Sequence, residues 1–332
     1  MKEYEPFQRV LDAFSLETPT ALPKLLTGGL MHRMYRVETS SGIWALKCLN
    51  PDVMRRPEAV GNLQAAERIA QKLSAIVPAS TAVLVHGHPL TVLSGQYYML
   101  FKWCRGEPIF PPDLTPAHCG MIGHILGRIH TAGLTLPDIP AAEKPAAIDW
   151  NALGKASGHI VLPWAVQFAA MLPQCMQWHD AARQAYAALN ATCVLSHRDL
   201  DPKNVLWEDN VPCLIDWEAA GPVNPNLEIF TALRGWSDNG AGGILEAQFQ
   251  AMLSAYCAER SVNGVPWKDI ASAAMTGVLE WLAYNVRRAC EDTADIAERK
   301  LGAAQVTATL NTLRTYETTT TQMLNLLYHF AN

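Results

Sequence analysis

One segment near the middle of the chain concentrates side chains that can do chemistry. It carries Asp199, then Asn204 five residues later, and Asp216 beyond an apolar stretch. Carboxylate and amide oxygens are hard ligands that suit Mg²⁺, which keeps several waters and bridges to phosphate oxygens. Two carboxylates ~4 Å apart repel by roughly 4 kcal/mol at an effective dielectric constant of 20. The set therefore predicts a site where a divalent cation or a substrate proton compensates negative charge.

The elements around these residues can bring them together. Pro202 disfavours a helix at the preceding residue, so residues 197–204 are expected to form a loop. Three short elements follow: a strand, a polar turn and a return strand, at residues 205–207, 208–210 and 213–215. If the two strands pair as a hairpin, Asn204 and Asp216 lie at the same end. Asp199 then lies beside them in the loop.

Three motifs carry a resemblance to known enzymes. His197-Arg198-Asp199 with Asn204 and Ile215-Asp216 resembles the catalytic and metal-binding loops of the protein-kinase-like superfamily. Within that superfamily, the chain is similar to the aminoglycoside phosphotransferase family, which includes choline-kinase-like small-molecule kinases. Leu126-Gly127-Arg128-Ile129-His130 resembles a helix of that family, and Asp216-Trp217-Glu218 with Gly221-Pro222 resembles its second metal motif. Together with features before and after these motifs, the resemblance spans about residues 26–285, most of the chain.

The resemblance implies an α+β, two-lobed, protein-kinase-like fold. A small β-rich N-lobe, residues 1–103, is expected to bind the nucleotide. A larger, mainly helical C-lobe, residues 104–332, is expected to carry the catalytic loop and the acceptor-binding helices. The patterns agree. Before the boundary they predict strands at 34–37, 43–49, 82–85 and 96–103 with a helix at 58–75. After it they predict a helix around 122–129 and long helices at 270–290 and 305–330.

The same resemblance implies a reaction and a role for each motif residue. The enzyme would move the γ-phosphate of ATP to a hydroxyl of a small molecule. Asp199 would act as the catalytic base or orient that hydroxyl, and Asn204 and Asp216 would hold Mg²⁺. His197 would brace the loop rather than react. Positioning and charge compensation would supply most of the rate, because phosphoryl transfer needs little covalent help.

The N-lobe residues that would hold ATP are less sharply marked. Ala45-Leu46-Lys47 resembles the strand whose lysine pairs the α- and β-phosphates. Its partner on the next helix stays open among Glu67, Gln64 and Glu58, and Glu67 is favoured by its charge.

Two backbone sites complete the expected nucleotide pocket. Gly28 and Gly29 lie where a phosphate-covering loop belongs, although the sequence lacks GxGxxG. By resemblance, the carbonyl of Lys102 and the N–H of Cys104 would meet adenine at the hinge.

Composition excludes several other classes. The 332 residues are 49% hydrophobic and 17% charged, which excludes a disordered chain. Lys and Arg total 26 against 31 Asp and Glu, so the net charge of −5 predicts no nucleic-acid partner. The most apolar stretch, 160–172, contains Pro163 and Gln167 and is shorter than the ~20 residues of a membrane span. Residues 1–5 lack an apolar signal, so we expect a cytoplasmic protein without a membrane partner.

Cysteine placement supports the same compartment. Eight cysteines are spread along the chain with no CxxC pair, at positions 48, 104, 119, 175, 193, 213, 257 and 290. This distribution is typical neither of a disulfide framework nor of a zinc site. We therefore expect reduced, mostly buried thiols.

Two alternative functions stay open. A protein kinase is disfavoured because Trp217-Glu218 replaces Phe-Gly after Asp216 and no Ala-Pro-Glu follows. A catalytically silent, pseudokinase-like nucleotide-binding module would show loss of the lysine, base or metal residues, and none is lost. Two departures from the family are Arg198, where many members have Gly, and Asp201, where His is frequent. Asp201 could form a turn into Pro202 or meet a cationic acceptor.

The acceptor hydroxyl is expected to belong to an aminoglycoside-like antibiotic, an amino alcohol or an amino-acid-like metabolite. Carboxylates that could meet a cationic acceptor are Glu218, Glu228 and Glu280, with Glu228 favoured as structural. Trp281 and Tyr284 could line an acceptor pocket, but their helical spacing from Glu280 is slightly more typical of core residues.

Overall fold

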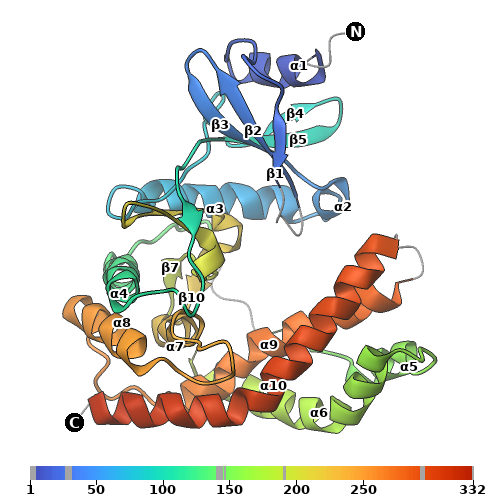
Figure 1. Cartoon of the computed structure of the whole chain (residues 1–332), viewed down its shortest axis with the longest axis vertical. Coiled ribbons are helices and arrows are strands. Elements are labelled where there is room, and N and C mark those ends of the chain that lie inside the picture. Colours follow the sequence, from blue (N-terminus) through green and yellow to red (C-terminus); the bar gives the residue numbers. More distant parts are fainter. Residues whose placement is uncertain are drawn as a thin grey trace. The chain divides into compact units, whose positions relative to one another are not determined.

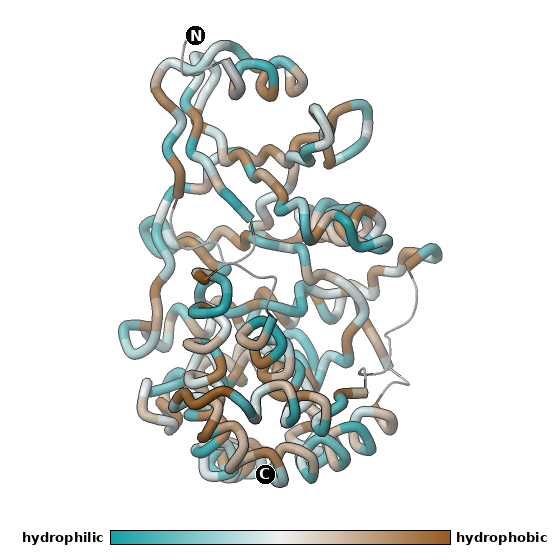
Figure 2. Tube along the Cα trace, turned by 90° about the vertical axis from the view of Figure 1, so that its right-hand side faces the viewer, coloured by the Kyte–Doolittle hydropathy of each residue, from teal (hydrophilic) through white to brown (hydrophobic). Residues whose placement is uncertain are grey.

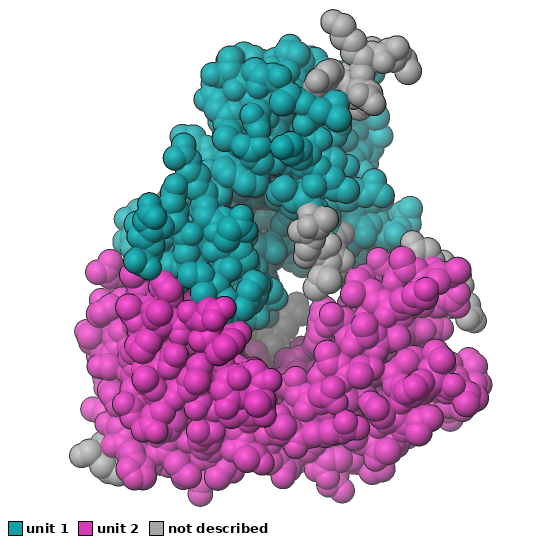
Figure 3. Space-filling model, in the orientation of Figure 1, with its two compact units in different colours: residues 1–110, 132–139, 195–221 teal, residues 111–131, 140–194, 222–332 magenta. Residues whose placement is uncertain are grey.

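The computed structural model describes residues 5–26, 32–139, 145, 147–189, 192–291 and 296–330. The chain forms two compact units, and it passes between them more than once (Figure 3). The first unit contains residues 1–110, 132–139 and 195–221, and the second contains residues 111–131, 140–194 and 222–332. The segment with Asp199, Asn204 and Asp216 thus belongs to the same unit as the N-terminal strands. The lobe boundary between 103 and 104 stays a prediction.

The first unit is built on a five-stranded sheet in the order β1-β2-β3-β5-β4 (Figure 1). All neighbouring strands in it are antiparallel. The strands are β1 (Lys24–Leu26), β2 (Arg33–Thr39), β3 (Gly42–Cys48), β4 (Thr91–Leu93) and β5 (Gln96–Lys102). The strand expected at 82–85 forms only isolated bridges, from Ala82 to Phe101 and from Val85 to His88. Pro89 and a tight turn at positive-φ His86 and Gly87 follow it directly.

The two faces of the sheet are covered by different helices. Val37, Leu46 and Leu100 are buried against α1 (Glu5–Ala13), whereas Met99 clusters with Leu63 of α3 (Ala59–Leu73). Successive strand residues point to opposite faces, and directly paired residues share a face. Because Lys47 pairs with Met99, its side chain leaves the sheet on the α3 face. Hydrophobic and hydrophilic residues are correspondingly mixed along these strands (Figure 2).

The predicted hairpin is present. β8 (Val205–Glu208) pairs with β9 (Val211–Leu214), with Val205 opposite Leu214, and β6 (Glu107–Pro108) adds a third strand. Asp209 and Asn210 both have positive φ, as a two-residue type I′ turn requires. Leu214 accepts the N–H of Ser80 and donates its own N–H to Pro78, both at 2.8 Å. These bonds tie the hairpin to the segment that follows α3, so the metal motif and the sheet are parts of one packed body.

A disulfide between Cys104 and Cys213 corrects the expectation that every thiol is reduced. The bond joins the segment after β5 to β9, with Cα atoms 6.5 Å apart and 109 residues between them in sequence. Cysteine spacing cannot reveal such a pair, because it is created by the pairing of distant strands. The remaining thiols are also less buried than expected: Cys119 and Cys175 are buried, Cys193 is exposed and the other three are half-buried.

The second unit is helical, as expected. Its helices are α4 (Pro116–Thr131), α5 (Trp150–Ser157), α6 (Pro163–Leu189), α7 (Pro225–Trp236), α8 (Glu246–Glu259), α9 (Trp267–Cys290) and α10 (Ile296–Phe330). Apolar residues of α5, α6, α9 and α10 form one buried cluster. Gly123 lets α4 approach α8 closely, because a Cβ there would lie 2.2 Å from the carbonyl oxygen of Met252. Within the described part of the chain, no helix is apolar enough over the length that a bilayer crossing requires.

The remaining elements are short. α2 (Pro51–Met54) follows β3 and is capped by the side chain of Asn50. Two strands, β7 (Val194–Ser196) and β10 (Gly221–Val223), flank the hairpin segment. Two 3-10 turns lie inside this segment, η1 (Pro202–Asn204) before β8 and η2 (Trp217–Ala219) after β9. No motif residue from 197 to 204 lies in an α-helix, as the loop prediction requires.

Candidate active site

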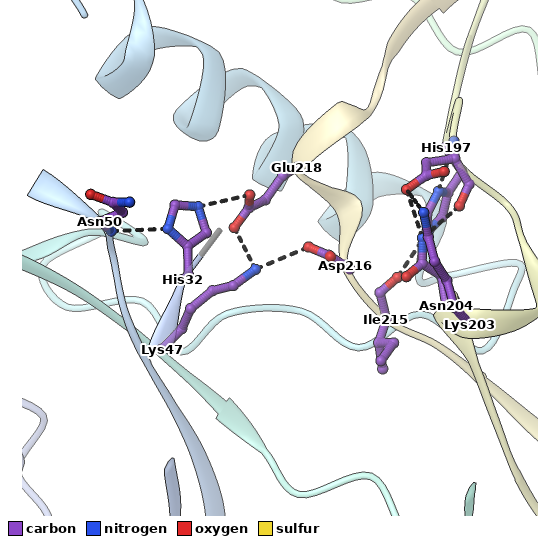
Figure 4. Close-up of polar contacts among 10 residues, drawn as sticks. His32, Lys47, Asn50, His197, Lys203, Asn204, Ile215, Asp216 and Glu218 are labelled. Atoms are coloured by element: carbon purple, nitrogen blue, oxygen red, sulfur yellow. Dashed lines mark hydrogen bonds and ion pairs between the residues drawn. The ribbon is translucent and has the colours of Figure 1, made fainter. Parts of the chain in front are cut away.

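His197 holds the loop that carries the candidate base. Its ring is fully buried and packs against Trp217, with ring centroids 4.5 Å apart. Nδ1 accepts the N–H of Asp199 at 3.3 Å, so the ring proton lies on Nε2, which donates to the carbonyl of Ile215 at 3.0 Å. His197 thereby joins the start of the loop to the residue before Asp216 (Figure 4). These contacts are those of a bracing residue, as expected.

Asp199 and Asn204 are in direct contact within the loop. The amide nitrogen of Asn204 donates to the backbone carbonyl of Asp199 at 2.7 Å and to Oδ2 of its carboxylate at 2.9 Å. The backbone carbonyl of Asn204 accepts the N–H of Ile215 at 2.9 Å. Asn204 is 4% exposed, whereas the side chain of Asp199 is 37% exposed. The carboxylate is thus held from the buried side and open to solvent on the other.

Lys203 is a residue of this cluster that the sequence analysis did not single out. Its ammonium lies 3.2 Å from Oδ2 of Asp199 and 3.6 Å from Oδ2 of Asp201. Burial opposes its charge, but the two carboxylates raise the pKa of Lys203. Burial and the neighbouring carboxylate of Asp199 raise the pKa of Asp201. The sequence feature that could have indicated Lys203 is its position, four residues after the candidate base Asp199.

Lys47 binds two carboxylates of the segment after the hairpin. Its ammonium donates to Oδ1 of Asp216 at 2.9 Å and also to Oε1 of Glu218 (Figure 4). The residue is only 8% exposed. Burial opposes the charge, but Asp216 and Glu218 raise the pKa of Lys47. The predicted lysine therefore lies beside Asp216, the candidate metal ligand, and neutralises two acids.

Glu218 has a second partner, His32. Nε2 of His32 lies 3.1 Å from Oε2 of Glu218, and Nδ1 of the same ring accepts the N–H of Asn50 at 2.9 Å. Burial would raise the pKa of Glu218, but His32 and Lys47 lower it to about 2. Glu218 is therefore a stable carboxylate, held by one donor on each oxygen. The sequence analysis listed it only as a candidate for the acceptor pocket.

Glu67, the favoured helix partner of Lys47, is engaged elsewhere. It lies in α3, is 4% exposed, and accepts the N–H of Ala82 at 2.6 Å and a side-chain N–H of Gln71 at 3.4 Å. Over the residues with described positions, its carboxylate forms no ion pair with Lys47. Burial raises the pKa of Glu67 to about 7, and the charge of Lys47 lowers it only slightly in comparison. In this structure the carboxylates that bind Lys47 come from the segment after β9 and not from α3.

Replacing Glu67 with Gln should change how stability depends on pH. A raised pKa in the folded state means that the stabilising contribution is present below pH ~4.5 and is lost as pH rises through ~7. Gln can still accept the Ala82 N–H but does not titrate. The free energy of unfolding of Glu67→Gln relative to wild type should therefore increase between pH 4.5 and 7.5, by roughly 3 kcal/mol. Urea unfolding across this range measures it.

Glu58→Gln is the matched control, because Glu58 is an exposed carboxylate just before the same helix. Its free energy of unfolding, measured over the same pH range, is the baseline for the comparison. Parallel pH profiles for Glu67→Gln and wild type would contradict the assigned titration of Glu67.

The side-chain oxygens of Asn204 and Asp216 suit a hard divalent cation that a bound ligand also coordinates. Asn204 uses its amide nitrogen on Asp199, which leaves the amide oxygen as the atom that can coordinate. Asp216 has a positive φ of 59° and a side chain that is 45% exposed. Among described residues, no three His, Cys, Asp or Glu side chains gather as a metal cage. An amide and a carboxylate oxygen fit Mg²⁺, which completes its octahedron with water and phosphate.

The remaining predicted nucleotide residues lie at or just after the end of β5, or outside the described residues. Gly28 and Gly29 lie outside the described residues. β5 ends at the exposed Lys102, and the N–H of Trp103 still donates to Ile43 at 3.1 Å. Cys104 follows and is bonded to Cys213. The backbone contacts with adenine stay a prediction.

The acceptor candidates fall in different environments. Glu228 is buried and pairs with His130 at 2.8 Å, and Tyr256 binds the other ring nitrogen of His130 at 2.8 Å. This supports the structural role expected for Glu228. Trp281 is 37% exposed and stacks on Tyr284 with centroids 5.7 Å apart. The expectation that Trp281 belongs to the core is therefore wrong, because its position on α9 faces away from the buried cluster.

Comparison with known proteins identifies the family. The model of the family described as "Phosphotransferase enzyme family" matches residues 23–262, which include the sheet, the loop and the hairpin. The chain belongs to this family. The resemblance to aminoglycoside phosphotransferases and choline-kinase-like enzymes is thereby confirmed, and the protein is a phosphotransferase enzyme.

Solved structures of phosphotransferase family folds match nearly the whole chain. The microcompartment-associated aminopropanol kinase has a TM-score of 0.67 at 14% identity, covering 95% of this chain and 98% of that one. Spectinomycin phosphotransferase in complex with ADP and spectinomycin has a TM-score of 0.65 at 13% identity, covering 92% and 98%. Choline kinase from Cryptosporidium parvum has a TM-score of 0.58 at 13% identity, covering 92% of both. At these identities the matches confirm the protein-kinase-like fold.

The chain is also similar in sequence to a curated protein. Homoserine kinase from Azorhizobium caulinodans is 24% identical over 197 residues. The match spans 59% of this chain and 59% of that protein.

Proposed function

We propose that this phosphotransferase moves the γ-phosphate of ATP to a hydroxyl group of a small molecule. The observation that carries the proposal is the geometry of Asp199, whose carboxylate is held by Asn204 at 2.9 Å and remains 37% exposed. A base for phosphoryl transfer needs this combination, because it must be oriented and must also reach a substrate hydroxyl. Lys47 and Asp216, which are in direct contact, supply the opposite charges that a phosphate and a cation require.

Each site residue has its own role in the proposed reaction. Asp199 accepts the proton of the acceptor hydroxyl as its oxygen attacks the γ-phosphorus, and ADP leaves from the opposite side. Lys47 leaves the carboxylates for the α- and β-phosphates when nucleotide binds. Asp216 and the amide oxygen of Asn204 would hold Mg²⁺, which supplies charge compensation for the phosphates. The backbones of Gly28, Gly29, Lys102 and Cys104 would contact the nucleotide, as the family resemblance implies.

The acceptor is an amino-bearing alcohol in this proposal. The names of the similar proteins support this class, since they include kinases of aminopropanol, choline and homoserine and a spectinomycin phosphotransferase. The net charge of −5 is compatible with a cationic acceptor. We place the enzyme in the cytoplasm, where ATP is supplied.

An ADP-release screen tests the proposal. Purified protein, ATP and Mg²⁺ are incubated separately with aminopropanol, choline, homoserine, spectinomycin, a macrolide and a generic protein substrate. We expect acceptor-dependent ADP release with at least one small molecule, and release slowed at least about 100-fold when Asp199→Asn replaces wild type. Phosphate transfer only to the generic protein would overturn the small-molecule assignment, and no ATP binding at all would overturn the phosphotransferase mechanism.

A further inference from the structure

We propose that His32 is a positioning residue, which holds Glu218 in place so that Lys47 can be released to the nucleotide phosphates. The inference rests on the proposed function and adds a residue to it. His32 immediately precedes β2, and its side chain is 5% exposed. Figure 4 shows two side chains in contact with Glu218, the ammonium of Lys47 and the imidazole of His32.

The tautomer of His32 is set by the backbone. The N–H of Asn50 donates to Nδ1 at 2.9 Å, so the ring proton lies on Nε2 and is directed at Oε2 of Glu218, 3.1 Å away. Asn50 is itself constrained, because its side chain caps α2 by accepting the N–H of Asp52 at 2.9 Å. The donor on His32 therefore has a fixed position and a fixed direction.

Glu218 accepts from two residues in different parts of the chain, one on each carboxylate oxygen. Oε1 accepts from Lys47 at the end of β3, and Oε2 accepts from His32 before β2. The side chain of Glu218 is 28% exposed, so water can supply only some of the hydrogen bonds that its carboxylate accepts. When Lys47 turns to a phosphate, His32 is the donor that remains. Without it, Glu218 would depend on Lys47 alone and would compete more strongly with the nucleotide for that ammonium.

Two substitutions of His32 separate positioning from packing. His32→Phe keeps the ring shape and removes both nitrogens, whereas His32→Gln keeps an N–H donor for Glu218. We expect His32→Phe to raise the KM for ATP and the Kd for ADP about tenfold, with kcat at saturating ATP changed less than threefold. His32→Gln should recover most of the nucleotide affinity. His88→Phe, an exposed histidine in a turn of the same unit, should leave all three constants unchanged.

The outcome that would overturn the inference is equally specific. A loss of kcat and of melting temperature in His32→Phe, with KM for ATP unchanged or with no recovery in His32→Gln, indicates a packing role only. In a Glu218→Gln background, His32→Phe should have little further effect on the Kd for ADP, and full additivity would contradict the proposed path through Glu218. Because ADP binding needs no acceptor, failure of this inference is distinguishable from failure of the proposed function, in which wild type binds no nucleotide.

Discussion

Asp199→Asn is expected to lower kcat by about 10²- to 10⁴-fold, the range of general acid–base contributions. The amide cannot accept the proton of the acceptor hydroxyl, but it is nearly the same size as the carboxylate. Asn204 can still donate to the side-chain oxygen at position 199, so the loop should keep its conformation. The affinity for ADP, measured by titration calorimetry, should change less than threefold.

The control for this prediction lies in the same segment. Asp209→Asn makes the same chemical change in the exposed turn between β8 and β9, where a positive φ of 47° suits Asn equally well. Its kcat should equal that of wild type. An Asp199→Asn variant with more than a tenth of wild-type kcat would show that another group acts as the base, and Asp201 would be the next residue to test.

Lys47→Met is expected to lower kcat/KM for ATP by about 10²- to 10³-fold, as loss of one fixed charge at a phosphoryl group typically does. The same change should lower the free energy of unfolding by roughly 1–3 kcal/mol, because Asp216 and Glu218 lose the ammonium that neutralises them. Both carboxylates keep some exposure to solvent, which limits this cost. Steady-state kinetics and urea unfolding measure the two effects.

A double variant separates the two consequences. Lys47→Met with Glu218→Gln removes one of the unpaired charges, so it should regain part of the stability while activity stays low. Lys24→Met is the matched control, since Lys24 is exposed on β1 and should be silent in both assays. If the single Lys47→Met variant keeps wild-type kcat/KM, the ammonium has no part in binding nucleotide.

The conformation of the candidate catalytic loop could be predicted from sequence because its determinants are local. Pro202 disfavours an α-helix, and the β-prone residues on either side of Asp209 and Asn210 make a hairpin. The hairpin register then places Asn204 beside Ile215, the residue before Asp216. Each step depends on residues within about twenty positions of one another. The long helices of the second unit were predictable for the same reason, since their apolar periodicity lies within each helix.

The partners of Lys47 could not be predicted in this way. Its carboxylates lie 169 and 171 residues away in sequence, and only the packing of the hairpin segment against the sheet brings them close. Glu67 has the expected charge on the expected helix, yet the N–H of Ala82 satisfies it. His32 carried no sequence signal, because its role depends on a backbone N–H of Asn50, which every residue except proline possesses.

The bond between Cys104 and Cys213 closes a covalent ring in the chain. α4, α5 and α6 all lie between these two cysteines in sequence. Residues 111–194 are therefore all part of this covalent ring. A protease that cuts once inside this ring leaves two fragments that stay linked through sulfur until a reductant is added. The segment after β5 and strand β9, which leads to Asp216, would thus remain covalently joined in a nicked molecule.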